Sequence, residues 1–182
     1  MTSTATERFS IPAKADVSEK NQQIFDSLHK NLGFVPNLYA YFAKNETALA
    51  DYLALQNRKS TLRAKEREVI NLVTSQINGC RYCQSAHTAI GKMNGFTDGQ
   101  ILELRTGKAS FDPKLDALAR FTASVVTNRG RASEESKEAF FAAGYGEQHM
   151  IDVVIVIGDK IISNYLHNLT GFEIDFPLAE AL

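Results

Sequence analysis

Glycine and capping residues divide this chain into segments that have the length and apolar spacing of α-helices. Between residues 17 and 169, apolar side chains recur every three or four positions, which is typical of helices with one face in a core. Most segments end near a glycine, and several begin at a helix-capping residue such as Thr97, Asp112 or Ser133. No run with the alternation and turn signals of a strand interrupts this pattern. The sequence therefore predicts an all-α fold, a bundle of roughly eight helices.

The most apolar segment runs from about Glu147 to Leu169. Met150, Ile151 and residues 153–157 are apolar nearly all round a helix, so we expect this helix to lie in the core or in a subunit interface. The β-branched residues in it would also suit a buried strand. The length of the segment, and the apolar residues that continue to Leu166, favour a helix.

The composition limits the classes of protein to which the chain can belong. It has 182 residues, of which 44% are hydrophobic and 23% charged, as in ordinary soluble proteins. With 20 basic and 21 acidic residues, it has no electrostatic reason to bind nucleic acid or an anionic membrane. No apolar run reaches the ~18 residues of a membrane span, and Met1 to Ser10 lack the apolar core of a signal peptide. We predict a cytoplasmic protein with one helical domain at 17–182, preceded by a flexible arm at 1–16.

Both cysteines lie at the start of a predicted helix. Asn78-Gly79 ends the preceding segment, and the next helix begins at or near Cys80. At about 100° per residue, Cys80, Cys83 and His87 fall within an arc of about 60°. Cysteines spaced i, i+3 can also reach disulfide geometry. Two thiols and an imidazole are therefore predicted to share one face of this helix.

This arrangement favours a reactive thiol. The partial positive charge of a helix N-terminus stabilises a thiolate, and a nearby imidazole can accept the thiol proton. A second cysteine allows a cycle between dithiol and disulfide. Arg81 and Tyr82, between the cysteines, indicate a partly exposed helix start. The helix dipole favours Cys80 as the attacking thiol, whereas the spacing to His87 favours Cys83.

Two interpretations without redox chemistry remain open. A Cys-x-x-Cys pair can be half of a zinc site, with His87 as a third ligand. The sequence offers no second Cys-x-x-Cys and no His-x-x-x-His to complete such a site, so we expect no bound metal. Alternatively, Cys80 and Cys83 could be buried and inert.

The spacing Glu68-x11-Cys80-x2-Cys83-x3-His87 resembles the signature of the alkylhydroperoxidase D-like proteins, within the carboxymuconolactone decarboxylase superfamily. The similarity extends from about Phe34 to Pro177 and is strongest over 61–105. The resemblance implies the alkylhydroperoxidase D-like type of helical bundle and a homo-oligomer, trimeric or hexameric. It also implies a thiol-dependent peroxidase or disulfide reductase that works without haem.

The resemblance further assigns roles to residues. It implies that Cys83 attacks a small hydroperoxide and that Cys80 then forms a disulfide with it, while His87 and Glu68 relay protons. No cofactor would be bound, and an external dithiol of the lipoyl or thioredoxin type would reduce the disulfide. Burial against apolar side chains would raise the pKa of Glu68 and make it a useful acid or base. The best-known members have a histidine just before the second cysteine, where this chain has Tyr82, a poor base at neutral pH.

Two other functions are compatible with the sequence. A redox sensor would use the same disulfide without turnover. A decarboxylase-type enzyme would act on a small lactone, although that branch of the superfamily lacks the Cys-x-x-Cys pair.

Three further segments carry local predictions. Ser60 or Thr61 can cap the helix that ends near residue 77. On the last helix, Asn164 and His167 could face a site, with His167 better explained as a structural histidine. We expect the tail at 171–182 to lie across a partner subunit.

Overall fold

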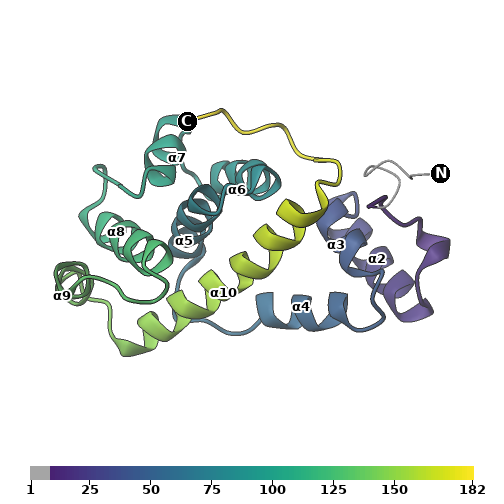
Figure 1. Ribbon diagram of the computed structural model, residues 1–182, viewed down its shortest axis with the longest axis horizontal. Helices are drawn as coiled ribbons and strands as arrows, with labels where there is room; N and C mark the ends of the chain where they lie inside the picture. The colour runs from purple at the N-terminus through teal and green to yellow at the C-terminus, as the bar shows by residue number, and fades with distance from the viewer. Residues whose placement is uncertain (1–8) are drawn as a thin grey trace. The chain divides into compact units, whose positions relative to one another are not determined.

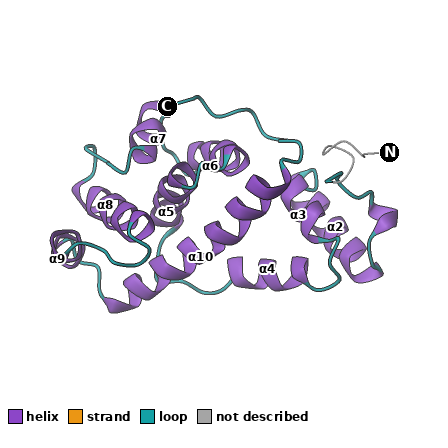
Figure 2. Ribbon diagram, viewed as in Figure 1, coloured by secondary structure: helices purple, strands orange, loops and turns teal. Residues whose placement is uncertain are grey.

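The computed structural model describes residues 9–182, and within this range every regular element is a helix (Figures 1 and 2). Nine of them are α-helices, which confirms the all-α prediction. The elements are η1, a short 3-10 helix (Lys14–Asp16), α2 (Glu19–Leu32), α3 (Asn37–Phe42), α4 (Ala48–Gln56), α5 (Ala64–Ile77), α6 (Arg81–Met93), α7 (Asp98–Arg105), α8 (Pro113–Thr127), α9 (Glu134–Ala142) and α10 (Glu147–Thr170).

Local sequence signals set several helix boundaries as predicted. The side chains of Thr97, Asp112 and Ser133 accept hydrogen bonds from backbone N–H groups in the first turns of α7, α8 and α9. Between α5 and α6, Gly79 has a φ of 65°, a left-handed conformation that favours glycine. This turn reverses the chain, so that α6 packs against α5.

The predicted cap of α5 was wrong. Arg63 is the N-cap residue of this helix, and its N–H donates to Glu66. Ser60 and Thr61 instead bind Asp152 of α10: the Oδ2 atom of Asp152 accepts from the Thr61 N–H (2.6 Å), the Thr61 hydroxyl (2.7 Å) and the Ser60 hydroxyl (3.0 Å). A buried carboxylate needs such donors, and it takes them from the segment that precedes α5.

The chain forms two compact units. The described residues up to 58 make one unit together with 166–175, and the other comprises 59–165 and 176–182. The predicted domain at 17–182 stays a prediction. Of the predicted arm at 1–16, residues 1–8 lie outside the described residues and 14–16 form η1. The core of the first unit contains Val17, Phe25, Ala40, Ala43 and Leu49.

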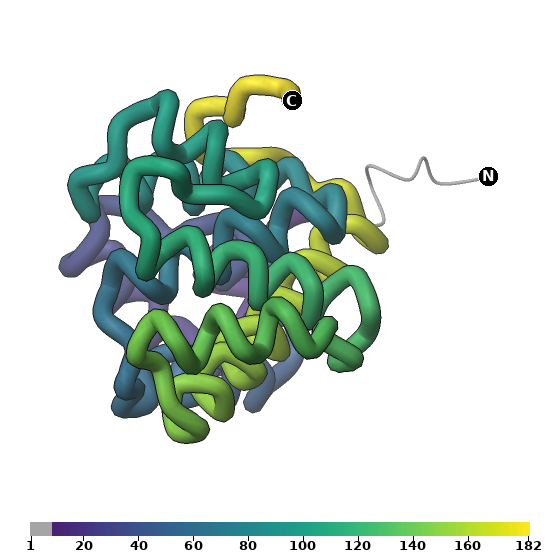
Figure 3. Tube along the Cα trace, turned by 90° about the vertical axis from the view of Figure 1, so that its left-hand side faces the viewer, coloured from purple at the N-terminus to yellow at the C-terminus, as the bar shows by residue number. Residues whose placement is uncertain are grey.

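The second unit is built around α5, which contacts α6, α7 and α8. Residues 68–75 of α5 are all buried, so this helix has neighbours on every side. In Figures 1 and 3, α8 and α9 lie side by side at the surface of this unit. Its core draws on five helices and includes Val69, Leu72, Leu104, Leu118, Phe121, Phe140, Val153 and Ile157.

The helix α10 is less buried than its composition predicts. Val153 and Ile157 lie in the core of the second unit. Ile151 is 56% exposed and Val154 is 54% exposed on the single chain. Burial all round the helix is therefore not observed within one chain. Among residues 9–182, none of the helices combines the length and the apolar character that crossing a bilayer requires.

The end of the chain contacts helices of its own chain, and the expectation that the tail also crosses a partner subunit stays a prediction. The Ala179 N–H donates to Ser85 Oγ of α6 at 3.0 Å. The guanidinium of Arg105, in α7, donates to the Glu180 carbonyl at 2.7 Å. Phe176 meets Tyr82 edge to face, with ring centroids 5.6 Å apart. The last residues of the chain thereby cover one face of α6.

Replacing Asp152 by Ala should lower the free energy of unfolding by about 2–3 kcal/mol, because hydrogen bonds to a charged acceptor are lost and their donors are left behind. Urea denaturation measures this change. Ser60→Ala, which removes only one of the donors, serves as the matched control and should cost about 1 kcal/mol. A loss below about 0.5 kcal/mol for Asp152→Ala would show that this contact does not hold α10 to the start of α5.

Candidate functional site

The turn between α5 and α6 places the two cysteines in direct contact. Cys80 is the N-cap residue of α6, and its sulfur accepts a hydrogen bond from the Cys83 N–H at 3.2 Å. The two sulfur atoms are 2.7 Å apart, and both cysteines are free thiols. A disulfide has its sulfurs about 2.05 Å apart, so only a small movement separates the reduced pair from a bonded one.

The predicted exposure of this helix start is found only at Arg81, and it was wrong for Tyr82 and the cysteines. Cys80 is 0% exposed, Cys83 2% and Tyr82 1%, and only Arg81 reaches solvent. Near the end of the chain, Phe176 packs against Tyr82 and contributes to its burial. The thiols are therefore held in a buried environment in which each nearby charge acts strongly on them.

Glu68 of α5 and His87 of the cysteine helix α6 form a buried pair. His87 Nδ1 lies 2.9 Å from Glu68 Oε2, and the Asn71 amide donates to Glu68 Oε1 at 2.8 Å. Burial alone would raise the pKa of Glu68, but the charge of His87 and the hydrogen bonds from His87 and Asn71 outweigh it and lower that pKa. The prediction of a raised pKa was wrong, because this carboxyl lies among hydrogen-bond donors as well as apolar side chains.

Lys160 of α10 completes this series of side chains. Its Nζ lies 3.0 Å from His87 Nε2 and 3.6 Å from Asp159 Oδ2, and the residue is 3% exposed. Lys160 was not among the predicted site residues. The signal for it was a lysine that continues the buried face of α10, one turn after Ile157 and just before the apolar residues Ile161 and Ile162. A charge on such a face indicates a specific partner.

Asn164 lies one turn after Lys160 and faces the cysteines, as the sequence suggested. This fully buried amide accepts from Asn78 Nδ2 at 3.0 Å, donates to Ser75 Oγ at 3.4 Å and also hydrogen-bonds Cys83. His167 belongs to the other compact unit, where its Nε2 donates to the Phe172 carbonyl at 3.1 Å. That contact agrees with a structural histidine.

The surroundings of the two sulfurs differ in their effect on ionisation. The hydrogen bond from Cys80 lowers the pKa of Cys83 to about 6; burial opposes this change, while Lys160, His87 and Asn164 add to it. The same hydrogen bond, together with burial, raises the pKa of Cys80. The site therefore favours a thiolate at Cys83 and a thiol at Cys80. The helix-dipole argument, which favoured Cys80, is outweighed by closer groups.

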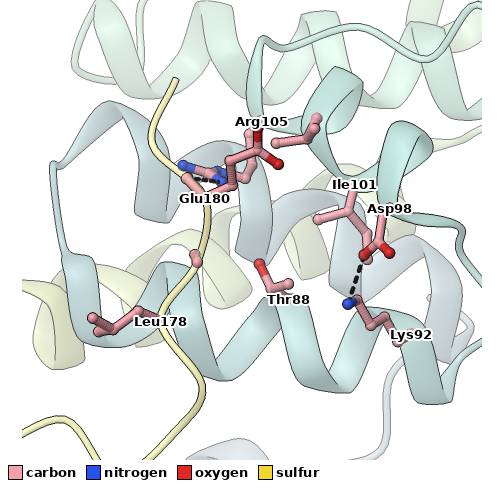
Figure 4. Close-up of a pocket in the computed structure, with 9 residues that line it drawn as sticks. Thr88, Lys92, Asp98, Ile101, Arg105, Leu178 and Glu180 are labelled. Atoms are coloured by element: carbon pink, nitrogen blue, oxygen red, sulfur yellow. Dashed lines mark hydrogen bonds and ion pairs between the residues drawn. The ribbon is translucent and has the colours of Figure 1, made fainter.

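A pocket of about 240 Å³ lies between α6, α7 and the end of the chain (Figure 4). The ion pair between Lys92 and Asp98 lies at one side, and Arg105 bound to Glu180 lies at the other. Neither cysteine lines this pocket, so it is separate from the thiol site. Among residues 9–182, no group of three or more His, Cys, Asp or Glu side chains is arranged to hold a metal ion.

Comparison with protein families gives a match over slightly less than half of the chain. Residues 41–124 match the model of the family described as the carboxymuconolactone decarboxylase family. This range contains all five predicted site residues, Glu68, Cys80, Tyr82, Cys83 and His87. A search of the curated proteins found no match.

Several solved structures share the fold. One is described as an alkylhydroperoxidase AhpD core, an uncharacterized peroxidase-related protein from Ralstonia eutropha JMP134; it is 24% identical over 92% of both chains, with a TM-score of 0.83. An uncharacterized peroxidase-related protein from Silicibacter sp. TM1040 is 24% identical over 91% of this chain and 88% of its own, with a TM-score of 0.80. The debrominase Bmp8 is 18% identical over 92% of this chain and 91% of its own, with a TM-score of 0.75. A cysteine-to-alanine variant of Bmp8 is known in complex with 2,3,4-tribromopyrrole.

The lowered pKa of Glu68 predicts a pH-dependent effect of Glu68→Gln. A carboxyl with a lowered pKa stabilises the fold above its unfolded pKa of about 4.3, and this contribution is lost as the pH falls below that value. Glu68→Gln should therefore lower the free energy of unfolding by about 3 kcal/mol at neutral pH and by progressively less below about pH 4. Urea denaturation across this pH range measures the difference. The exposed Glu46→Gln is the control, and a difference for Glu68→Gln that stays constant with pH would contradict the assignment.

Proposed function

We propose that this chain is an alkylhydroperoxidase D-like member of the carboxymuconolactone decarboxylase superfamily, and that it is a thiol-dependent peroxidase that reduces hydroperoxides through Cys80 and Cys83. The family match over residues 41–124 and the shared fold support this proposal. The observation that carries the proposal is the pair of sulfurs 2.7 Å apart whose pKa values move in opposite directions. One thiolate to attack and one adjacent thiol to resolve are what a dithiol peroxidase requires.

In the first half of the proposed cycle, the Cys83 thiolate attacks the terminal oxygen of a hydroperoxide. An S–O bond forms while the O–O bond breaks, so Cys83 is oxidised to a sulfenic acid and the peroxide is reduced. The departing alkoxide takes up one proton and leaves as an alcohol, or as water when the substrate is hydrogen peroxide. The hydrogen bond between Glu68 and His87 holds His87 in place, and the positive charge of Lys160 and His87 stabilises the thiolate.

In the second half, Cys80 attacks the sulfenic sulfur. The S–S bond forms, the S–O bond breaks, and the hydroxyl leaves as water once it has taken the proton that Cys80 loses. The contact between the sulfurs supports this step, since Cys80 needs no large movement to reach Cys83. Tyr82 points into the packing against Phe176, which supports a structural role for it in place of the relay role of a histidine.

An external dithiol completes the cycle. Two of its thiols reduce the Cys80–Cys83 disulfide and leave as a disulfide themselves, so no bound cofactor takes part. We assign this reductant to the lipoyl or thioredoxin type. The proposal includes a trimeric or hexameric assembly in the cytoplasm, and the exposed apolar residues Ile151 and Val154 of α10 support a subunit contact.

Reductive dehalogenation is a second candidate, because the fold is shared with the debrominase Bmp8. The Cys83 thiolate would attack bromine instead of oxygen, forming an S–Br bond while the C–Br bond breaks. The carbon that is left takes up a proton. Cys80 would then displace bromide and form the same disulfide, so this chemistry consumes the same dithiol.

Peroxide consumption with a panel of dithiols tests the proposal most broadly. Wild-type protein should consume hydroperoxide catalytically with at least one dithiol, and Cys80→Ser and Cys83→Ser should both lose turnover. Consumption that stops after one equivalent would favour a redox sensor. Turnover of a brominated pyrrole without turnover of peroxide would favour dehalogenation, and activity that survives loss of both cysteines would favour a decarboxylase-type pocket.

The roles of the two cysteines can be separated by trapping the sulfenic acid. Cys83→Ser should abolish trapping by a dimedone-type probe after one addition of peroxide, because it removes the attacking sulfur. Cys80→Ser should increase trapping, because the sulfenic acid then has no thiol to condense with. The reverse pattern would exchange the two roles.

The pKa of Cys83 sets the pH dependence of the first step. With a pKa of about 6, the thiolate fraction rises as the pH rises through this value. The second-order rate constant for oxidation by peroxide should therefore increase about tenfold between about pH 5 and about pH 7 and then level off. Stopped-flow measurement under single-turnover conditions gives this profile. A rate that continues to climb to about pH 9 would mean that Cys83 has the pKa of an ordinary thiol.

A further inference from the structure

The contact between Lys160 and His87 requires a specific distribution of protons. A hydrogen bond between two nitrogens 3.0 Å apart needs one donor and one acceptor. An ammonium and an imidazolium would both be donors, and they would repel each other in a buried site. The pair therefore holds one positive charge, placed either on Lys160 or on His87.

The other nitrogen of His87 is already engaged. Its Nδ1 lies 2.9 Å from Glu68 Oε2, and it donates its proton to that ionised carboxylate. Glu68 thereby fixes the ring so that Nε2 faces Lys160. With both nitrogens occupied, His87 has no free lone pair for the Cys83 thiol.

The charged and titratable groups around Lys160 come from three helices. Glu68 lies on α5, Cys80, Cys83 and His87 lie on α6, and Asp159 lies on α10 itself. The charge of Lys160 acts on Glu68 and on both sulfurs. A lysine that is 3% exposed stays charged in such a site only if nearby anions compensate it. The Cys83 thiolate is one such anion.

We propose that Lys160 and His87 act as one acid–base unit carrying a single positive charge, and that Lys160 is the positioning residue that keeps this charge beside Cys83. The inference rests on the proposed thiol function and extends it. In place of a relay that ends at a histidine, the chain uses a lysine from α10, which reaches the site from a distant part of the sequence.

The proton balance of the peroxidase cycle fits this unit. The unit takes the proton of the Cys83 thiol and becomes positive, and it gives that proton to the departing alkoxide. It is then neutral and takes the proton of Cys80 as that sulfur attacks the sulfenic acid. Finally it returns the proton to the departing hydroxide, which leaves as water. One hydroperoxide and two thiols thus yield one alcohol, one disulfide and one water.

The pH dependence of Cys83 alkylation by iodoacetamide, followed by mass spectrometry of the cysteine-containing peptide, tests the proposal without any peroxide. In wild-type protein the midpoint should lie near the Cys83 pKa of about 6. Lys160→Met should move it toward the ordinary thiol value of about 8.5, which lowers alkylation at about pH 6 by more than tenfold. Lys160→Arg keeps the cation and should retain a low midpoint. Because no turnover is measured, a failure here is distinct from a failure of the proposed peroxidase function.

His87→Gln provides the opposite case. It leaves Lys160 as an ammonium beside Cys83, so the midpoint should stay low. If His87 alone were the base, Lys160→Met would free the Nε2 atom of His87, and the alkylation midpoint would stay near 6. His87→Gln would then raise the midpoint. This pair of results would overturn the proposal.

A surface lysine supplies the matched control. Lys92→Met removes a half-exposed lysine from the cysteine helix itself and should leave the midpoint unchanged. Circular dichroism checks that each variant folds. Should Lys160→Met fail to fold, His87→Gln decides: a midpoint near 6 supports the lysine, and one near 8.5 excludes it.

Discussion

A buried series of hydrogen bonds from Asn71 through Glu68 and His87 to Lys160 underlies the structure of the candidate site. Each of these groups would cost about 2 kcal/mol or more if it were buried without a partner. In the series, Asn71 Nδ2 and His87 Nδ1 each contact an oxygen of Glu68, and Lys160 Nζ contacts His87 Nε2. The series therefore joins α5, α6 and α10 through buried polar contacts, and two of its members, Lys160 and His87, lower the pKa of Cys83.

The fold brings the residues of this series and the two cysteines together. The turn at Gly79 returns α6 along α5, which brings His87 to Glu68 and sets Cys80 at the N-cap beside Cys83. The end of the chain then covers α6 through Ser85 and Tyr82, and the thiols are left without direct access to bulk water. Low exposure strengthens each electrostatic effect on the sulfurs. It also requires a local opening before a large dithiol can reach them.

The parts of the structure that follow from nearby residues were predictable, and those that follow from distant ones were not. Caps such as Thr97 and Asp112 act within one helical turn, so the sequence alone locates them. The cysteine hairpin was predictable for the same reason. The contacts of Asp152 and Lys160 join segments far apart in sequence. The spacing of residues within one segment does not predict such contacts. The pKa of Glu68 was mispredicted because its direction depends on such partners.

Two of the proteins with this fold are peroxidase-related, and one is a debrominase. The fold alone therefore does not determine which kind of substrate a protein of this type reduces. The central proposal for this protein is that the two sulfurs form one redox couple. Mapping the thiols by peptide mass spectrometry after one equivalent of hydroperoxide tests that claim most directly. We expect a Cys80–Cys83 disulfide in nearly every molecule, and we expect a dithiol to reduce it completely. Two thiols that remain reduced, or Cys83 oxidised beyond sulfenic acid with Cys80 untouched, would contradict it.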